Sequence, residues 1–545
     1  MRRREIARVS NLLQAQMLQD VNINPVQPSL SEANLNVVTQ GGPAEAGFNE
    51  FTPLFERQQA QVNASGVVGN NDTYGGEGVA SMVYDRYSLS AGAFGYRSDG
   101  WRDNNDIKQD VEDVFFQAAI TPELNAQVEL RRRQSDEGDL AFNFDQDAFS
   151  PNLRRDVDQH TYRAGVRYSP LPSSDFLLSF IYGDLEDRVT DTVDDFASDS
   201  RTKDQGSQTE GQYIYSRERF NLTTGFGYSD IDRNLDDSLI LGGIIPLVDE
   251  SNKQQITEIS GYVYGNLNFP DPVTWTAGFS YDQFEQNVLK VDKFNPKFGV
   301  QWNVRDDLTL RGAVFRTVKP ALVNNQTLEP TEVAGFNQLF DDTNGTAAWR
   351  YGVGLDHRAT DNLLIGGEAT WRELSNPILD FEAQNKRLEN SDEQTHRAYV
   401  HWLPIPEVVL NFEFVYDRYT AEKGRNLTVG VGVPEKAVTY SVPVGVRYFH
   451  PSGFFAGAGA TYVHQDVNRD DLSGLPEGSD DFVVVDAAVG YRLPRRLGIV
   501  SLSVSNLLDE GLEYQDDSYR EFQDQPSIGP YFPERLIFGR ITLNW

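Results

Sequence analysis

Acidic residues offer the most direct chemistry in this sequence, and one short stretch carries them at regular spacing. Asp230, Asp232, Asn234 and Asp236 stand at every second position, as the oxygen ligands of a calcium-binding loop do. Such a loop would also need a glycine at position 235 and a glutamate at position 241, and leucine occupies both positions. We therefore interpret the stretch as a solvated acidic loop rather than a metal site.

The other residue types provide no second candidate for catalysis. The six histidines share no metal-ligand spacing, and His396 and His401 fall on opposite faces of one predicted strand. The sequence has no cysteine, which excludes thiolate ligands, disulfides and cysteine nucleophiles. No serine-nucleophile, phosphate-binding or dinucleotide-binding motif occurs in a suitable context. The sequence predicts no catalytic residue, no metal site and no cofactor, and an enzyme is the least favoured alternative.

A set of charged residues stands within alternating strand patterns, opposite a face of apolar and aromatic residues. A dry protein core would not accept such a charged face, but a water-filled barrel interior does. As a set, these groups are expected to tune selectivity for a solute, whereas any single one is expected to pair with a neighbour or hydrate the wall. The lumen-facing candidates are Arg163, Arg167, Lys297, Arg311, Arg350, Glu368, Arg372, Glu413, Arg447, Asp486 and Arg540.

The elements that position these residues are strands, which follow one another from about Arg57 to the end of the chain. About 22 segments alternate with the period of two that strands require. Short turns such as Asp85-Arg86 alternate with long polar stretches, although the rule has two exceptions. This alternation is typical of a bacterial outer-membrane barrel with both termini in the periplasm. The predicted long loops are 135–157, 187–203, 231–252, 318–342, 376–393, 422–435 and 508–534.

The last strand carries the clearest membrane signal. Ile537, Ile541, Leu543 and Trp545 share one face, and the chain stops on the aromatic residue without a polar tail. In a soluble sandwich, which is the alternative, this strand would be an exposed and adhesive edge. In an outer-membrane barrel it closes against the first strand and places its terminal aromatic residue in the interfacial girdle.

Composition agrees with a barrel and disfavours nucleic acid as a partner. The 545 residues carry a net charge of -33, whereas nucleic-acid binding needs a basic surface. No apolar run is long enough for a transmembrane helix. The 24 tyrosines, 32 phenylalanines and 7 tryptophans can supply aromatic girdles at both membrane interfaces.

Residues 1–56 differ from the barrel at 57–545. Residues 5–19 have the apolar spacing of an amphipathic helix, and proline and glycine then interrupt regular structure. The basic residues after Met1 precede no apolar stretch, so we predict no signal peptide. Because a barrel needs export, we expect a processed or truncated chain. The first 56 residues are expected to be periplasmic or to lie in the lumen.

The C-terminal region resembles the last two strands of TonB-dependent outer-membrane receptors. The resemblance rests on Leu502–Asp509 and on Pro533–Trp545, which match the turn and the start of the final strand in that family. It implies a barrel of 22 strands, in agreement with the pattern. The family also has a folded plug domain and a TonB box, but residues 1–56 are too short for such a plug. A helix followed by an extended link also resembles the junction of a periplasmic helical-repeat array with a barrel.

We therefore predict an all-β, transmembrane antiparallel barrel that moves a solute or polymer through a charged lumen. A 22-stranded barrel has a plugged lumen, so residues 1–56 or a partner should fill part of it. The alternative function is an outer-membrane anchor whose long acidic loops bind a surface partner or assemble a complex. Expected partners are outer-membrane lipid, the barrel-assembly machinery through the C-terminal strand, and a periplasmic helical-repeat domain or complex partner.

Overall fold

The computed structural model describes most of the chain, but only a small part of the N-terminal segment. The described residues are 13–19, 58–242, 245–287, 289–339, 342–380, 385–422, 433–469, 474–519 and 529–545. Of the helix predicted at 5–19, residues 13–18 are helical, and the remainder of 1–56 lies outside the described residues. In the described part of the chain, no helix is long and apolar enough to cross a bilayer.

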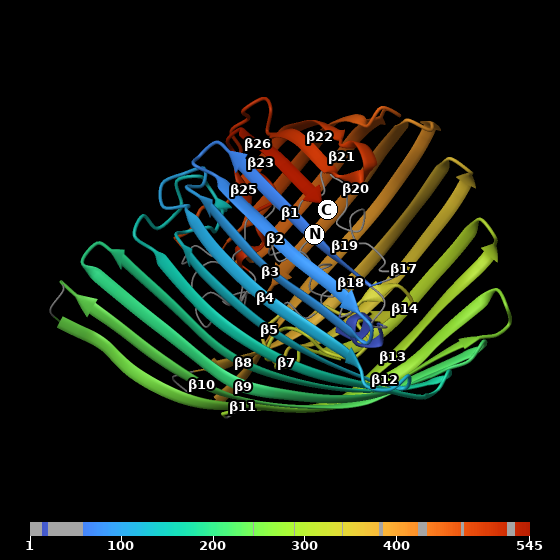
Figure 1. Cartoon of the computed structure of the whole chain (residues 1–545). Helices are drawn as coiled ribbons and strands as arrows, with labels where there is room; N and C mark the ends of the chain where they lie inside the picture. The colour runs from blue at the N-terminus through green and yellow to red at the C-terminus, as the bar shows by residue number, and fades with distance from the viewer. Residues whose placement is uncertain are drawn as a thin grey trace.

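The described strands form a closed antiparallel barrel of 22 strands, because β1 pairs with β26 (Figure 1). The barrel strands are β1 (Gln59–Gly69), β2 (Tyr74–Tyr84), β3 (Tyr87–Ser98), β4 (Ile107–Ala119), β5 (Leu124–Glu137), β7 (Arg154–Leu171), β8 (Ser174–Val193), β9 (Phe196–Ser216), β10 (Phe220–Leu241), β11 (Ile245–Asn268), β12 (Val273–Gln286), β13 (Leu289–Arg305), β14 (Leu308–Val318), β17 (Ala347–Thr360), β18 (Leu363–Asp380), β19 (Asn385–Ile405), β20 (Val408–Ala421), β21 (Lys436–Phe449), β22 (Phe454–Asn468), β23 (Gly478–Arg492), β24 (Gly498–Ser505) and β26 (Leu536–Asn544).

Four short strands lie outside this ring. β15 (Glu332–Val333) pairs with β16 (Phe336–Asn337), and β6 (Asn143–Phe144) pairs with β25 (Tyr514–Gln515). Two single-turn 3-10 helices, η2 (Pro494–Arg496) and η3 (Asp517–Tyr519), complete the described elements. The β15–β16 hairpin and the β6–β25 pair both belong to connections between barrel strands, and each organises one of the inward-folded regions described below.

Alternation along the strands separates an apolar outer face from a mixed inner face. On β8, Phe176, Leu178 and Phe180 are exposed, whereas Leu177 and Ile181, at alternate positions, are buried. The last strand follows the same rule, since Ile537, Ile541 and Trp545 are exposed while Phe538 is buried. Exposed apolar side chains on the outside of a closed sheet are the surface that lipid covers.

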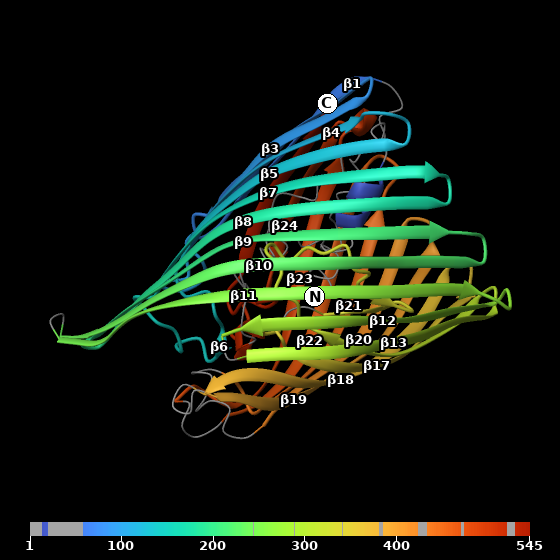
Figure 2. The same cartoon turned by 90° about the horizontal axis from the view of Figure 1, so that it is seen from below.

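Three predicted loops are strands instead. Residues 187–203, 231–252 and 376–393 continue the hairpins β8–β9, β10–β11 and β18–β19 almost to their tips. Figure 2 shows the β10–β11 hairpin projecting beyond its neighbours. On the outer parts of β8–β9 and β10–β11 nearly all side chains are exposed or half-buried on both faces, so these stretches lack the buried apolar face by which the sequence pattern marks a strand, while the backbone ladder remains complete. On β18–β19 the buried residues are polar, namely Asn376, Glu389 and Ser391, so they give no apolar face either.

The acidic stretch therefore lies on a strand. Asp230, Asp232, Asn234 and Asp236 belong to β10, where same-face neighbours are about 7 Å apart. An extended strand spreads these oxygens along its length, whereas a calcium loop wraps them around one ion. Within the described residues, no group of acidic or histidine side chains has a geometry suited to a metal ion.

Candidate functional site

Two segments fold into the barrel and fill one side of its lumen. The first is the helix at 13–18, and the second is the stretch 319–339 between β14 and β17, named here the lumen loop. Figures 1 and 2 both place the helix inside the ring of strands. Leu13 and Met17 of the helix pack with Leu177 and Ile181 of β8 and with Leu328 of the lumen loop. The helix and the loop therefore share one small apolar core inside the barrel.

Polar side chains of the wall also hold the helix. Gln14 Nε2 donates to Gln212 Oε1 at 2.7 Å, and Gln117 Nε2 donates to the carbonyl of Gln19 at 2.8 Å. Arg163 donates to the side chain of Gln16. Arg167 donates to the carbonyl of Leu18, a helix-end acceptor that has no partner within the helix. These two arginines, predicted to face the lumen, act here as anchors for the N-terminal segment.

The first part of the lumen loop, residues 320–329, is held mainly by hydrogen bonds to β9, β10 and β11. Glu210 on β9 accepts from Thr327 Oγ1 at 2.9 Å and from the backbone nitrogen of Leu328 at 2.6 Å. Glu258 on β11 accepts from the backbone nitrogen of Ala321. Ser229 Oγ on β10 donates to the carbonyl of Ala321 at 2.8 Å. The wall thus satisfies the loop backbone, as an inward-folded loop requires.

The second part of the lumen loop, residues 332–339, is anchored by apolar contacts. Val333 and Phe336 are buried against Tyr262, Tyr264 and Phe315 of the wall.

Glycines on the wall permit this close approach. A Cβ at Gly299 would lie 2.6 Å from the Cβ of Ala334, and one at Gly352 would lie 2.5 Å from the ring of Phe336. The wall therefore has glycines, which lack side chains, at the positions where the β15–β16 hairpin packs against it.

Lys297 lies between the two parts of the loop. Its Nζ donates to Gln338 Oε1 at 2.7 Å and to the carbonyl of Arg316 at 3.2 Å, and lies 3.6 Å from Glu329 Oε1. Tyr264 donates its hydroxyl proton to the same Glu329 oxygen at 2.6 Å. The side chain of Lys297 is almost fully buried, so its charge depends on these partners.

A ladder of ion pairs covers the next strands of the wall. Arg311 Nε on β14 lies 3.0 Å from Asp356 on β17, and its terminal nitrogen lies 3.5 Å from Glu368 on β18. Arg397 on β19 makes a two-pronged pair with Glu413 on β20, at 2.7 and 3.0 Å. These charges pair with one another and lie on strands that face the lumen.

The remaining sequence-predicted candidates fall into two groups. Arg350 donates to the carbonyl of Asn337 at 2.6 Å, and Arg372 pairs with Asp342 and Glu393, so both lie close to the lumen loop. Arg447, Asp486 and Arg540 lie on β21, β23 and β26 and are not brought into this cluster. Asp486 accepts from the backbone nitrogen of Asn506 at 3.0 Å, at the end of β24.

Sequence reasoning missed the carboxylates that hold the loop. Glu210 and Glu258 are 5% and 4% exposed and contact residues far away in the chain. Both lie on strands with polar residues on each face, where charge alone does not indicate which face is inside. A polar residue at every second position, as at Gln208, Glu210 and Gln212, is the one signal that would have suggested an inward polar face.

A second inward-folded region, named here the loop cap, comprises residues 139–153, 506–519 and 529–535. Its centre is aromatic: Phe142 lies 5.2 Å from Trp101 between ring centroids and packs with Phe482, Leu512 and Tyr514. The β6–β25 pair joins the first two stretches of the cap.

One buried carboxylate sits within the loop cap. Asp516 accepts from the backbone nitrogens of Phe142 and Ser518, at 3.3 and 2.8 Å. Burial is the main cause that raises the pKa of Asp516 to about 6, and the hydrogen bonds oppose this shift.

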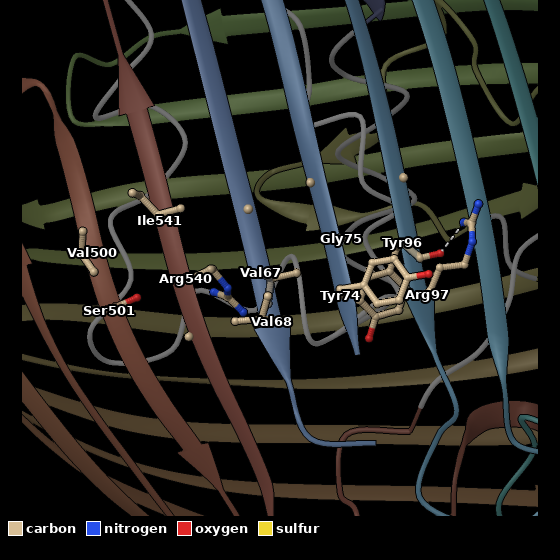
Figure 3. A pocket seen from close by; sticks show the side chains of 14 residues that line it. Val67, Val68, Tyr74, Gly75, Tyr96, Arg97, Val500, Ser501, Arg540 and Ile541 are labelled. Carbon is tan, nitrogen blue, oxygen red and sulfur yellow. Dashed lines mark hydrogen bonds between the residues drawn. The ribbon is translucent and has the colours of Figure 1, made fainter. Parts of the chain in front are cut away.

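A large hollow of about 690 Å³ lies at the seam where β26 meets β1 (Figure 3). Strand register sets Gly66 of β1 opposite Gly76 of β2, which stands opposite Gly95 of β3. The neighbouring side chains Val68 and Tyr74 are strongly exposed on the outer face. The hollow therefore results from a row of glycines on the membrane-facing surface and does not belong to the lumen.

Comparison with known families decides what kind of barrel this is. The family described as "TonB dependent receptor-like, beta-barrel" matches residues 84–507, which is most of the chain. The chain belongs to the TonB-dependent receptor family. No curated protein matches it in sequence. The family comprises outer-membrane transport proteins rather than enzymes, so the predictions of an outer-membrane location and of no enzymatic activity are confirmed.

Solved structures of TonB-dependent receptors share the fold at low sequence identity. The chain is 12% identical to the copper transporter OprC, with a TM-score of 0.68 over 90% of this chain and 81% of that one. It is 11% identical to the ferripyoverdine receptor of Pseudomonas aeruginosa, with a TM-score of 0.64 over 90% and 72%. The chain is also 11% identical to the siderophore receptor PiuA from Acinetobacter baumannii, with a TM-score of 0.64 over 90% of this chain and 82% of that one. The predicted 22-stranded receptor-like barrel is confirmed.

Proposed function

We propose that this TonB-dependent receptor-like barrel moves a solute across the outer membrane through its lumen, and that its own inward-folded segments gate the passage. One observation carries the proposal: the helix at 13–18 and the lumen loop occupy the lumen together and meet at Leu328. Much of their attachment is by hydrogen bonds, which water can replace at a small net cost per bond. The helix and the lumen loop can therefore be displaced from the barrel wall.

We place both termini and the short turns on the periplasmic side. The short turns, such as the one after Tyr84, and the end of β26 lie at one end of the barrel, and the long connections lie at the other. Long connections face outward in barrels of this class. In this orientation the lumen loop enters from outside, while the helix belongs to a segment that reaches the barrel from the periplasm.

The charged wall supplies the selectivity in this proposal. Arg311, Asp356 and Glu368 lie next to the lumen loop, and the Arg397–Glu413 pair continues the ladder. Rings of charged side chains select among solutes by charge and hydrogen bonding. Proteins of similar fold are named as a copper transporter and as siderophore receptors, so a metal ion or a metal chelate is the first solute class to test.

The test is single-channel conductance of the purified barrel in a planar bilayer. The full chain should conduct weakly, because both segments fill the lumen. Replacing Leu13 and Met17 by glutamate should raise the conductance by displacing the helix, and replacing residues 320–329 by a short glycine-serine link should raise it further. A matched control is glutamate at the exposed Val193, on the tip of the β8–β9 hairpin. Zero conductance in all of these variants would overturn the transport proposal.

An anchor or assembly role is the second candidate, and the projecting hairpins favour it. The β8–β9 and β10–β11 ladders extend well beyond the shorter strands of the seam and offer surfaces outside the membrane that are largely polar, except at the β10–β11 tip, where Ile245, Leu247 and Val248 are exposed. A periplasmic helical-repeat partner at the N-terminal segment, and the barrel-assembly machinery at β26, also belong to this proposal. A partner that co-purifies stoichiometrically and is lost when the β10–β11 tip is shortened would favour this role over solute flux.

A further inference from the structure

Beneath the first part of the lumen loop lies a group of buried carboxylates with too few cations. Glu210 on β9, Glu258 on β11 and Asp282 on β12 are each 5% exposed or less, and β10 lies between the first two of these strands. They line a small, partly open pocket of about 30 Å³ beneath residues 320–329. A space of this size holds about one or two water-sized groups.

One oxygen of this group has no partner. Glu258 accepts a hydrogen bond through Oε2, whereas its Oε1 is buried without one. Neither Glu210 nor Glu258 forms an ion pair with another described residue. An unpaired buried carboxylate oxygen is costly, so this arrangement favours protonation of the carboxyl group, a positively charged occupant or exposure to water.

Two nearby ammonium groups, those of Lys297 and Lys319, interact electrostatically with Asp282 and Glu258 but are too few to balance all of these charges. Lys297 is committed to Gln338 and Glu329, and Lys319 donates to the carbonyl of Pro320 at 2.7 Å and to Asn344 at 3.2 Å. With Glu329 included, carboxylates around this space outnumber ammonium groups. The patch is therefore acidic as a whole.

The segment above the patch is attached differently from the rest of the loop. Residues 332–339 rest on buried aromatic rings, whereas 320–329 combine backbone hydrogen bonds to wall side chains with the smaller apolar contacts of Ala321 and Leu328. Displacing 320–329 would exchange these bonds for bonds to water and would hydrate the carboxylates. The hairpin anchor would remain in place during this movement.

We propose that residues 320–329 are a lid over an acidic patch of Glu210, Glu258 and Asp282, and that the uncovered patch binds positively charged solutes. The inference rests on the proposed transport function, because it names the charge class that the passage accepts. It also makes the lumen loop, and not only the N-terminal segment, responsible for closing this side of the barrel.

The test uses a cysteine reporter, since the natural chain has no cysteine. Ser260 lies on β11, lines this pocket and makes no bond that holds the lid, so Ser260→Cys reports access to the patch. A cationic and an anionic methanethiosulfonate reagent of similar size are applied to the full-length barrel in detergent. Ser198→Cys, on the exposed tip of the β8–β9 hairpin, is the control for reagent reactivity.

We expect the cationic reagent to modify Cys at 260 roughly tenfold faster than the anionic one, after normalisation to the control. Replacing 320–329 by a short glycine-serine link should accelerate both reagents. E210Q combined with E258Q should bring the ratio close to one, since glutamine keeps the shape and removes the charge. Circular dichroism and heat-modifiable gel mobility show whether each variant is folded.

Two results would overturn the inference: a reagent ratio unchanged by E210Q with E258Q, or labelling no faster after the lid is replaced. These readouts do not require transport. The expected labelling without any solute flux would keep the lid and the patch and reject the proposed function. Solute flux without the expected labelling would support the proposed function and reject the lid and the patch.

Discussion

The lumen loop and the loop cap both fold inward between barrel strands, but different side chains hold them. The first part of the lumen loop is attached through Glu210, Glu258 and other polar groups of the wall. The loop cap is attached through packed rings such as Phe142 and Phe482. Water competes well for hydrogen bonds and poorly for buried aromatic surface. The comparison indicates that the lumen loop is the releasable element and that the cap is the permanent one.

The largest expected effect comes from removing an aromatic ring from the cap. Phe142→Ala should cost about 3–5 kcal/mol of local stability, as buried phenylalanine truncations do. Hydrogen exchange of residues 139–153 should accelerate, while exchange of residues 320–339 should not change. Phe196→Ala, at an exposed hairpin tip, is the control. Equal acceleration in both regions would mean that the cap and the lumen loop open together, against the comparison.

Removing the buried cation should loosen the lumen loop. Lys297→Met leaves Glu329 and Gln338 without their partner and should cost about 3 kcal/mol, with a matching rise in hydrogen exchange across 320–339. Single-channel conductance should rise in the same variant. Lys290→Met is the matched control, because this lysine lies on the same strand in an exposed ion pair with Glu285. An unchanged exchange rate would show that Lys297 does not hold the loop.

The cap should respond to pH through Asp516. Its pKa is raised to about 6, so its contribution to cap stability is complete below the pKa of an unfolded aspartate and is lost as pH rises through 6. Opening of the cap should increase about tenfold between pH 5 and pH 7. Hydrogen exchange of residues 139–153, corrected for intrinsic rates, measures this change. In Asp516→Asn the pH dependence should disappear, and its persistence would assign it to another group.

The smallest effect is expected on the wall ladder. Arg397 and Glu413 form a half-exposed pair, so a double-mutant cycle with Arg397→Gln and Glu413→Gln should give about 1 kcal/mol or less of coupling. Thermal unfolding of the barrel measures this coupling. Conductance selectivity should change more than stability does. A coupling energy of several kcal/mol would show that this pair contributes as much to stability as a buried ion pair does. The wall would then not differ from the lumen loop in this respect.

The barrel was predictable wherever its two faces differ. Around Tyr162 and Arg163 an apolar outer face alternates with a charged inner face, and these residues form β7 as expected. The hairpin extensions near Asp191 and Asp236 were not predictable, because both of their faces meet water. The alternation of apolar and polar residues appears only where one face of a strand is apolar, whereas the backbone hydrogen bonds between strands continue where neither face is.

The site was predictable in part. Lys297 and Arg350 were recognisable as inward charges because their strands are apolar on the outside. The partners of these two residues were not predictable. Gln338 and Asn337 belong to a loop whose path depends on contacts made after the barrel closes. For the same reason the partners of Glu210 were not predictable: Thr327 and Leu328 are more than one hundred positions away.

The glycine row at the seam has a mechanical consequence. β1 and β26 pair over a short stretch, from Asn63 to Gly69 with two further backbone hydrogen bonds between Val62 and Trp545, whereas β10 and β11 pair along their whole length. The same place lacks outward side chains that would stiffen the wall at Gly66, Gly76 and Gly95. The neighbouring pairings β23–β24 and β24–β26 are similarly short. Under lateral tension in the bilayer, the cylinder is therefore expected to yield first in this region of short pairings, from β23 through β26 to β1.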